Sequence, residues 1–206
     1  MTRFYLIRHG ETEWNAGQQR YSGRTDIELS EHGRQQAIQA AELLKEARYN
    51  RVIASTLTRA KQTAEPIAAI HGLKMQTDER LVEADFGQWE GLYAHVIHKE
   101  YADQWQAWVA DPSDVRAGGT GETRAEIADR MTRFLQEAAV EYAEERIVVV
   151  SHSTAIRLTV ASILGMPLHH FRRLNLNNTG ITIIDAGSKG GFTVVQFNGG
   201  LTELYR

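Results

Sequence analysis

Short apolar runs alternate with helical patterns along this chain of 206 residues. Three of the runs, Phe4–Ile7, Arg51–Ala54 and Ile147–Val150, are almost continuous in aliphatic and aromatic residues. Runs of this length without polar alternation are typical of strands that are buried on both faces. The pattern therefore predicts a mostly parallel sheet with helices packed on its two sides.

The first two apolar runs each lead to a predicted helix. Ser30 can cap a helix whose apolar positions recur at helical spacing as far as Leu44. A second helix is expected to open at Ser55-Thr56 and to run toward Gly72. Pro66 lies inside this second pattern, so we expect it to kink the helix or to end its first part.

The second half of the chain has stronger patterns. A long amphipathic helix is expected to start near Glu122, before the third apolar run. After that run, another helix should follow Ser151-His152-Ser153 and stop at Gly165. Residues 180–184 and 192–195 flank a Gly-rich turn and predict an antiparallel hairpin, which makes the sheet mixed.

The segment from about residue 89 to residue 121 has a weaker pattern and is interpreted as a cap inserted into one domain, 1–206. A chain of this length can bury one sizeable core. Trp105 and Trp108 are expected to pack under the cap, with an aromatic rim to a pocket as the alternative. The expected fold is thus a three-layer α/β/α sandwich with a small cap.

Charge and composition exclude several classes of protein. The formal net charge of −3 gives no basis for binding nucleic acid or an anionic membrane, and no segment resembles a membrane span or a signal peptide. The absence of cysteine excludes disulfides, thiolate chemistry and cysteine-based metal sites. We therefore expect a cytoplasmic protein.

Charged residues follow the predicted strands at the same end. Arg8 and His9 follow the first strand, Arg59 comes soon after the second, and His152 follows the third. In sheets of this type, ligands bind beyond the carboxyl ends of the strands. The planar guanidinium groups of Arg8 and Arg59 can each bind two oxygens of a phosphate monoester, and their two positive charges match its two negative charges. No metal ion is then needed to neutralise the phosphate.

The chain resembles the histidine phosphatase superfamily, also called the phosphoglycerate mutase-like family, over nearly its whole length. The segments that carry this resemblance, in the family's order, are Leu6–Thr12 (LIRHGET), Asn15, Gly23–Asp26 with Leu29, Gly33–Ala37, Ser55–Ala64, Glu83–Gly91 and Ser151-His152. A single Arg-His-Gly would be weak evidence, whereas these segments together are specific.

The resemblance implies phosphomonoester hydrolysis of a small phosphorylated metabolite, without a cofactor or metal. His9 would be the nucleophile and form a phosphohistidine, one ring nitrogen attacking while the other is held by a backbone carbonyl. Glu83 would act as general acid and base, and His152 would hold a phosphate oxygen. The residues expected to bind the phosphate are Arg8, Thr12, Asn15, Gly23, Arg59 and Ser153.

Two alternative functions remain open at the level of sequence. A phosphoglycerate mutase would use the same pocket, but such mutases usually carry a longer, proline-rich insertion before the second histidine, and here Pro112 is the only proline in that interval. A non-catalytic phosphate-binding regulator is the second alternative. Ser153-Thr154, where many relatives have glycines, and Gly118–Thr123 depart from the family's common pattern and bear on the substrate. The sequence leaves the oligomeric state open.

Several other polar residues have simpler interpretations. His95 with His98, and His169 with His170, lack a third ligand at a recognisable spacing, so exposed histidines are expected at both pairs. Arg172-Arg173 is expected to be a solvated or helix-end pair rather than a phosphate site. The segment Asn177–Gly180 either helps to shape the pocket or is only a turn.

Overall fold

The fold was examined in a computed structural model that describes residues 1–17, 20–110, 114–187 and 191–199. Pro112 lies outside these residues. The strands are β1 (Thr2–Arg8), β2 (Arg51–Ser55), β3 (Met75–Asp78), β4 (Arg146–Ser151), β5 (Ile181–Ala186) and β6 (Phe192–Gly199). The α-helices are α1 (Glu31–Leu44), α2 (Thr58–Ile70), α3 (Ala94–Glu100), α4 (Ala102–Ala110), α5 (Arg124–Glu141) and α6 (Ser153–Ile163). Short 3-10 helices are η1 (Glu79–Leu81), η2 (Gly87–Trp89), η3 (Ala117–Gly119) and η4 (Leu168–Arg173).

The strands form one mixed sheet in the order β3-β2-β4-β1-β5-β6. The first four strands of this order are mutually parallel, while β5 pairs antiparallel with both β1 and β6. The predicted α/β fold with a mostly parallel mixed sheet is therefore confirmed. The antiparallel hairpin of β5 and β6 is also where the sequence predicts it.

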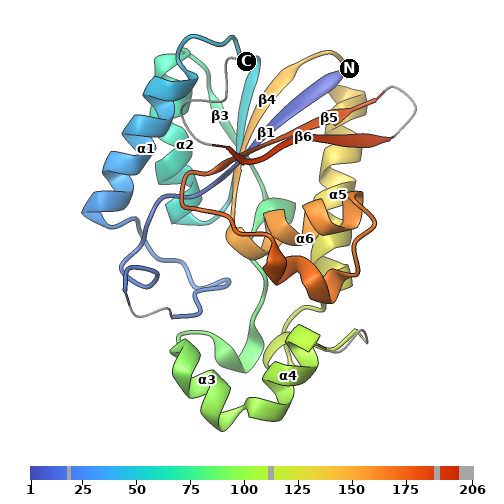
Figure 1. Cartoon of the computed structure of the whole chain (residues 1–206). Helices are drawn as coiled ribbons and strands as arrows, with labels where there is room; N and C mark the ends of the chain where they lie inside the picture. Colours follow the sequence, from blue (N-terminus) through green and yellow to red (C-terminus); the bar gives the residue numbers. More distant parts are fainter. Residues whose placement is uncertain (18–19, 111–113, 188–190, 200–206) are drawn as a thin grey trace.

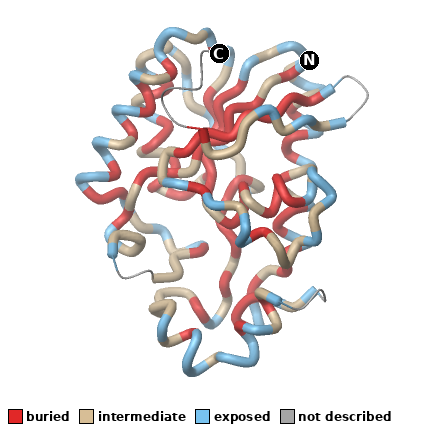
Figure 2. The backbone as a smooth tube through the Cα atoms, in the orientation of Figure 1, coloured by how far each residue is buried: buried red, intermediate tan, exposed pale blue. Residues whose placement is uncertain are grey.

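Helices cover both faces of the sheet (Figure 1). Side chains of β1 alternate between two cores: Tyr5 and Ile7 pack with α1 and α2, whereas Phe4 and Leu6 pack with α5 and α6. All four side chains are buried, which explains the continuous apolar run. Figure 2 shows the central strands as buried along most of their length.

Capping residues place the starts of two helices. Ser30 accepts a hydrogen bond from the backbone N–H of Gly33, as the sequence predicts for α1. Helix α5 begins at Arg124, slightly later than Glu122, because Thr123 and Glu126 form a reciprocal capping box. None of the helices in the described ranges is long and apolar enough to cross a membrane.

Pro66 does not end helix α2, which runs on to Ile70. A proline at this position removes one backbone hydrogen bond, at a cost of about 3 kcal/mol in an isolated helix. The apolar side of the helix compensates here, because Ala64, Ile67 and Ala68 are buried in the core shared with α1 and the sheet.

The interval expected to be a cap contains α3, α4 and η3, which lie below the carboxyl edge of the sheet (Figure 1). Trp105 and Trp108 are both buried, and their rings lie 5.8 and 6.5 Å from that of Trp89. Trp108 also packs against Phe171 of η4. These aromatic contacts join the cap to the main body beside the site.

Candidate active site

A cleft of about 290 Å³ opens at the carboxyl edge of the sheet. Arg8 ends β1 and lies opposite Ser151, which ends the parallel neighbour β4. The residues that follow, His9 and His152, have ring centroids 5.1 Å apart. The structure thus brings together two histidines that are far apart in sequence, as the strand pattern predicts.

Hydrogen bonding fixes the ring of His9. Its Nδ1 lies 2.6 Å from the carbonyl oxygen of Gly10, so Nδ1 carries the proton and Nε2 keeps its lone pair. Burial, and then the positive charges of Arg59 and Arg8, lower the pKa of His9 well below its usual value. His9 is therefore neutral at physiological pH, and it lines the cleft.

His152 is completely buried and is held by Ser55, whose hydroxyl lies 2.8 Å from Nε2. Ser55 Oγ also accepts from the backbone N–H of Leu57, so its own hydrogen can be donated to Nε2. Burial and the charge of Arg59 lower the pKa of His152 well below its usual value. The neutral ring then carries its proton on Nδ1, a buried atom without a partner among the described residues.

Two arginines flank the histidines, Arg59 being buried and Arg8 half-buried. Arg8 donates from Nη1 to the carbonyl of Leu176 at 2.7 Å, and Arg59 donates to the carbonyls of Thr25 and Gly23 at 2.9 and 2.6 Å. Burial lowers the pKa of both guanidinium groups, with Glu83 opposing this effect. Arg8 lines the cleft, whereas Arg59 is fully buried beside it.

Helix α2 connects Arg59 to the loop that carries His9. Thr63, one turn after Arg59, donates its hydroxyl to the Arg59 carbonyl at 2.8 Å and accepts from the N–H of Gly10 at 3.0 Å. The position of the His9 loop therefore depends on the first turns of α2.

Glu83 lies in the cleft wall and is only 6% exposed. Its Oε1 accepts from the N–H groups of Ala84 and Ala155, at 2.9 and 3.0 Å, and its Oε2 accepts from that of Thr154 at 3.0 Å. Two of these donors belong to the first turn of α6, where N–H groups lack partners within the helix. The helix start thereby fixes the carboxylate beside His9 and His152.

The remaining residues expected to bind phosphate have different positions. Asn15 and Ser153 line the cleft, and Asn15 accepts from the N–H of Thr12 at 2.9 Å. The hydroxyl of Thr12 is buried and has no partner among the described residues. Gly23 is buried and its carbonyl accepts from Arg59, so Gly23 contacts this buried arginine rather than lining the cleft.

The loop between η4 and β5 contains Asn177–Gly180, a segment that the sequence leaves either as part of the pocket or as only a turn. The structure shows that it contacts the site. Asn178 donates from Nδ2 to the carbonyl of His9 at 2.9 Å, and the N–H of Thr179 donates to the carbonyl of Arg8 at 3.0 Å. Thr179 adopts a left-handed backbone conformation with φ of 54°. This turn therefore helps to hold the backbone of the Arg8-His9 pair.

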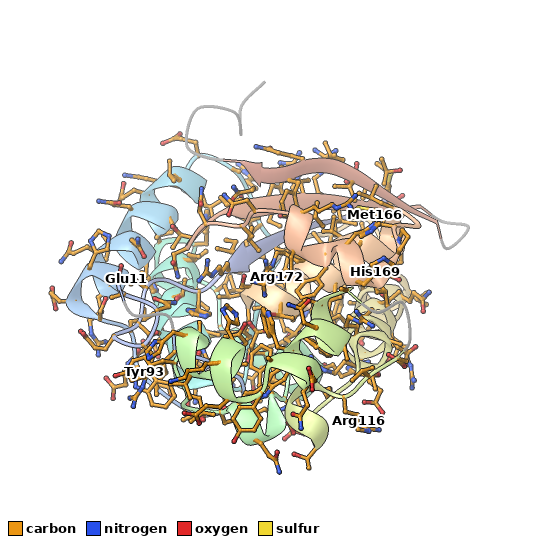
Figure 3. All side chains as sticks on the ribbon, turned by 60° about the horizontal axis from the view of Figure 1, so that its bottom comes forward. Glu11, Tyr93, Arg116, Met166, His169 and Arg172 are labelled. Carbon is orange, nitrogen blue, oxygen red and sulfur yellow. The ribbon has the colours of Figure 1, made fainter. Side chains whose placement is uncertain are left out.

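Sequence reasoning missed Arg157 and Phe171, which line the outer wall of the cleft together with Tyr21. Arg172 and Arg173 are both exposed in the last turn of η4, as predicted, and Arg172 also lines the cleft, whereas Arg173 does not. In Figure 3 Arg172 lies near the middle of the view, between the cap helices and the main body. A helical-spacing argument on α6 could have found Arg157, because it lies one turn after Ser153.

The histidine pairs away from the cleft differ in exposure. His95 and His98 are exposed, as predicted, and their rings pack on Tyr93 and Trp105. The prediction was wrong for His169 and His170, which are only partly exposed because their rings pack on each other at 4.1 Å. Within the described ranges, no group of three histidine, aspartate or glutamate side chains could hold a metal ion.

Comparisons of the sequence and of the fold with known proteins all find phosphatases and phosphoglycerate mutases of one family. A family model described as the histidine phosphatase superfamily (branch 1) matches residues 4–199. Phosphoserine phosphatase 1 of Hydrogenobacter thermophilus is 32% identical over 89% of this chain and 86% of its own. A probable phosphoglycerate mutase of Erwinia tasmaniensis is 36% identical over 90% and 85%, respectively. The crystal structure of a mutant phosphoserine phosphatase from Entamoeba histolytica, in complex with phosphoserine, superposes with a TM-score of 0.87 at 30% identity, covering 99% of this chain and 100% of that one.

Proposed function

Because this chain belongs to the histidine phosphatase superfamily, we propose that it hydrolyses phosphate monoesters of small metabolites through a phosphohistidine on His9. The family and the relatives support phosphatase or mutase activity, and the fold is that of its phosphatase neighbours. A small phosphorylated metabolite as substrate agrees with the phosphoserine bound by the Entamoeba histolytica protein.

The state of His9 is the observation that carries this proposal. A nucleophilic imidazole needs one unprotonated nitrogen that faces the substrate. His9 has its proton on Nδ1, bound to the Gly10 carbonyl, and its pKa is lowered by burial and by Arg59 and Arg8. Nε2 is therefore the attacking atom, beside cations that attract a phosphate dianion.

The reaction has two steps. Nε2 of His9 forms a bond to phosphorus as the ester P–O bond breaks, and the leaving oxygen takes a proton from Glu83. A water molecule then attacks the phosphorus of the phosphohistidine and gives a proton to Glu83. The N–P bond breaks in this step, so inorganic phosphate is released and His9 is restored. The location of Glu83 in the cleft wall, where the start of α6 holds its carboxylate, supports this role.

Charge neutralisation comes from arginine in this scheme. Arg8 and Arg59 bind the equatorial oxygens of the phosphoryl group, Asn15, Thr12 and Ser153 add neutral donors, and Gly23 positions Arg59. Because two guanidinium groups balance the dianion, we propose that the reaction needs no metal ion.

A phosphate-release assay with excess EDTA tests the proposal. The panel would contain phosphoglycerates, phosphoserine, sugar phosphates, nucleotides and an aryl phosphate. We expect release from at least one small ester at the same rate with and without the chelator. Loss of activity in EDTA that returns with added Mg²⁺ would refute the metal-free mechanism. Measurable binding of these esters without turnover of any of them would favour the non-catalytic regulator.

Ser55 provides a test of the role of His152. With Ser55→Ala, Nε2 loses its donor and the proton is no longer confined to Nδ1, so a phosphate oxygen loses a hydrogen bond. We expect kcat/KM to fall about 10- to 100-fold. Nitrogen-15 NMR of labelled histidine would show the Nδ1–H tautomer of His152 in the wild type and a mixture in the variant. An unchanged tautomer with reduced activity would make Ser55 merely structural.

Phosphoglycerate mutase activity is a second candidate, favoured by the identity to probable mutases. The same phosphohistidine would return its phosphoryl group to the bound acid instead of to water. Incubation with 3-phosphoglycerate and a trace of the bisphosphate separates the two activities. We expect phosphate release, and conversion to 2-phosphoglycerate without comparable release would identify a mutase.

A further inference from the structure

The outer end of the cleft holds two arginines that the proposed reaction does not use, Arg157 of α6 and Arg172 of η4. We infer that they form a second anion site, which selects phosphate monoesters that carry a carboxylate a few bonds from the phosphate. This inference rests on the proposed function and specifies its substrate class.

Arg157 is positioned by its own helix and by an aromatic ring. Its Nε donates to the carbonyl of Ser153 at 3.1 Å, and its guanidinium carbon lies 5.1 Å from the centre of the Phe171 ring. These contacts leave the Nη groups for a ligand. Burial lowers the pKa of Arg157 to about 10, with smaller contributions from the positive charges of Arg172 and Arg8. A bound anion would relieve this repulsion.

Arg172 approaches the cleft from the side of the cap. Its guanidinium lies 4.8 Å from the centre of the Trp105 ring, and its positive charge opposes the burial that raises the pKa of Tyr21. Both Arg172 and Arg157 influence the titration of Tyr21, which places the three groups together at the outer end. Arg172 is exposed at this end of the cleft.

The charges of the cleft wall are unbalanced. Among the described residues that line it, four are arginines (Arg8, Arg20, Arg157 and Arg172), and Glu83 is the only carboxylate. None of these arginines forms an ion pair with a described carboxylate, whereas eight arginines elsewhere do. Unpaired cations that are partly buried are costly, so the cleft is suited to a ligand with several negative charges.

A carboxylate fits this site better than a second phosphate does. The wall has three more positive than negative charges and Arg59 adds another beside it, so a phosphate dianion alone leaves positive charge that a carboxylate would balance. A planar guanidinium can also bind a carboxylate through two parallel hydrogen bonds. The cleft of about 290 Å³ lies at the lower end of the usual range for small-molecule sites, so it favours a short ester.

The test compares two esters that differ only in the group in question: 3-phosphoglycerate and glycerol 3-phosphate, in which a hydroxymethyl group replaces the carboxylate. For the wild type we expect kcat/KM to be about 10- to 100-fold higher for 3-phosphoglycerate, as for loss of a hydrogen bond to a charged group. Arg157→Gln and Arg172→Gln should each reduce this ratio about tenfold or more. Taking the ratio removes any effect of either change on phosphate binding itself.

Arg173→Gln is the matched control, because Arg173 is adjacent to Arg172 and exposed but does not line the cleft. It should keep the wild-type ratio. A second pair of esters, fructose 1,6-bisphosphate and fructose 6-phosphate, differs in a second phosphate group instead of a carboxylate. If the ratio of kcat/KM were larger for this pair than for the first pair, the assignment of the site to a carboxylate would be overturned. Equal kcat/KM for the first pair of esters would overturn the second anion site.

Binding separates this inference from the proposed function. If the wild type released phosphate from no ester, the proposed hydrolysis would fail, but calorimetry with the same two esters would still test the site. Tighter binding of 3-phosphoglycerate than of glycerol 3-phosphate, weakened by Arg172→Gln, supports the inference, and equal dissociation constants refute it. Arg172 is exposed, so this variant is expected to fold even if Arg157→Gln does not.

Discussion

His9→Ala is expected to abolish phosphate release, with kcat reduced about 10⁴-fold or more. The substitution removes Nε2, the atom that forms the covalent bond, and no other described side chain with a free ring nitrogen lines the cleft. The arginines remain, so the variant should still bind phosphate esters. Rapid quenching of the wild type with a radiolabelled ester should trap an acid-labile, alkali-stable phosphohistidine that is absent from the variant.

A matched control for this change is His95→Ala, since His95 is exposed in the cap region and does not line the cleft. It should retain wild-type turnover. Circular dichroism and thermal melting of both variants would establish that they are folded. Wild-type-like turnover in His9→Ala, or a trapped phosphoenzyme that persists in it, would end the mechanism proposed for this protein.

Glu83→Gln is expected to reduce kcat about 10²- to 10⁴-fold, because the leaving oxygen and the attacking water lose their proton donor and acceptor. The loss should depend on the leaving group. The glycerol of glycerol 3-phosphate would leave as a poor, alkoxide leaving group unless it is protonated, whereas 4-nitrophenolate leaves easily. The fall in kcat should therefore be far larger for glycerol 3-phosphate than for 4-nitrophenyl phosphate. Steady-state kinetics with both esters would measure this difference.

The amide also changes the hydrogen bonds of this position. Glu83 accepts three backbone N–H groups through its two oxygens, and in glutamine an NH₂ group would face at least one of those donors. Thermal melting therefore accompanies the kinetics. Glu79→Gln, at an exposed position four residues earlier, is the control. An equal loss for both esters would mean that Glu83 positions the start of α6 instead of transferring protons.

The inner part of the site could be predicted because it is built from strand ends. Buried parallel strands have a strong sequence pattern, and the residues after them must meet at one edge. Arg8, His9 and His152 could be placed together by this argument alone. Glu83 could not, since it follows η1 and is brought to the cleft by the start of α6; only the family resemblance identified it.

The outer part of the site could not be predicted, because its residues are selected by tertiary packing. Arg172 and Arg173 are adjacent and chemically identical, and only the packing of η4 against Trp105 turns one of them toward the cleft. Strand β3 was missed for a related reason. Its sequence, Met75–Asp78, is mostly polar because it forms the sheet edge, so it lacks the apolar signal of the central strands.

The position of β1 in the sheet has a consequence for biosynthesis. Its neighbours β4 and β5 both lie in the last third of the chain, so β1 is translated long before either partner. At typical translation rates of 5–20 residues per second, its apolar segment waits about 7 to 30 s before its partner β4 has been made. During that interval Phe4–Ile7 is a strand exposed on both edges, which favours association with other chains and binding by chaperones. Because His9 directly follows this strand, its backbone can be held in place only after β4 and the turn before β5, which supply Ser151 and Asn178, have been made.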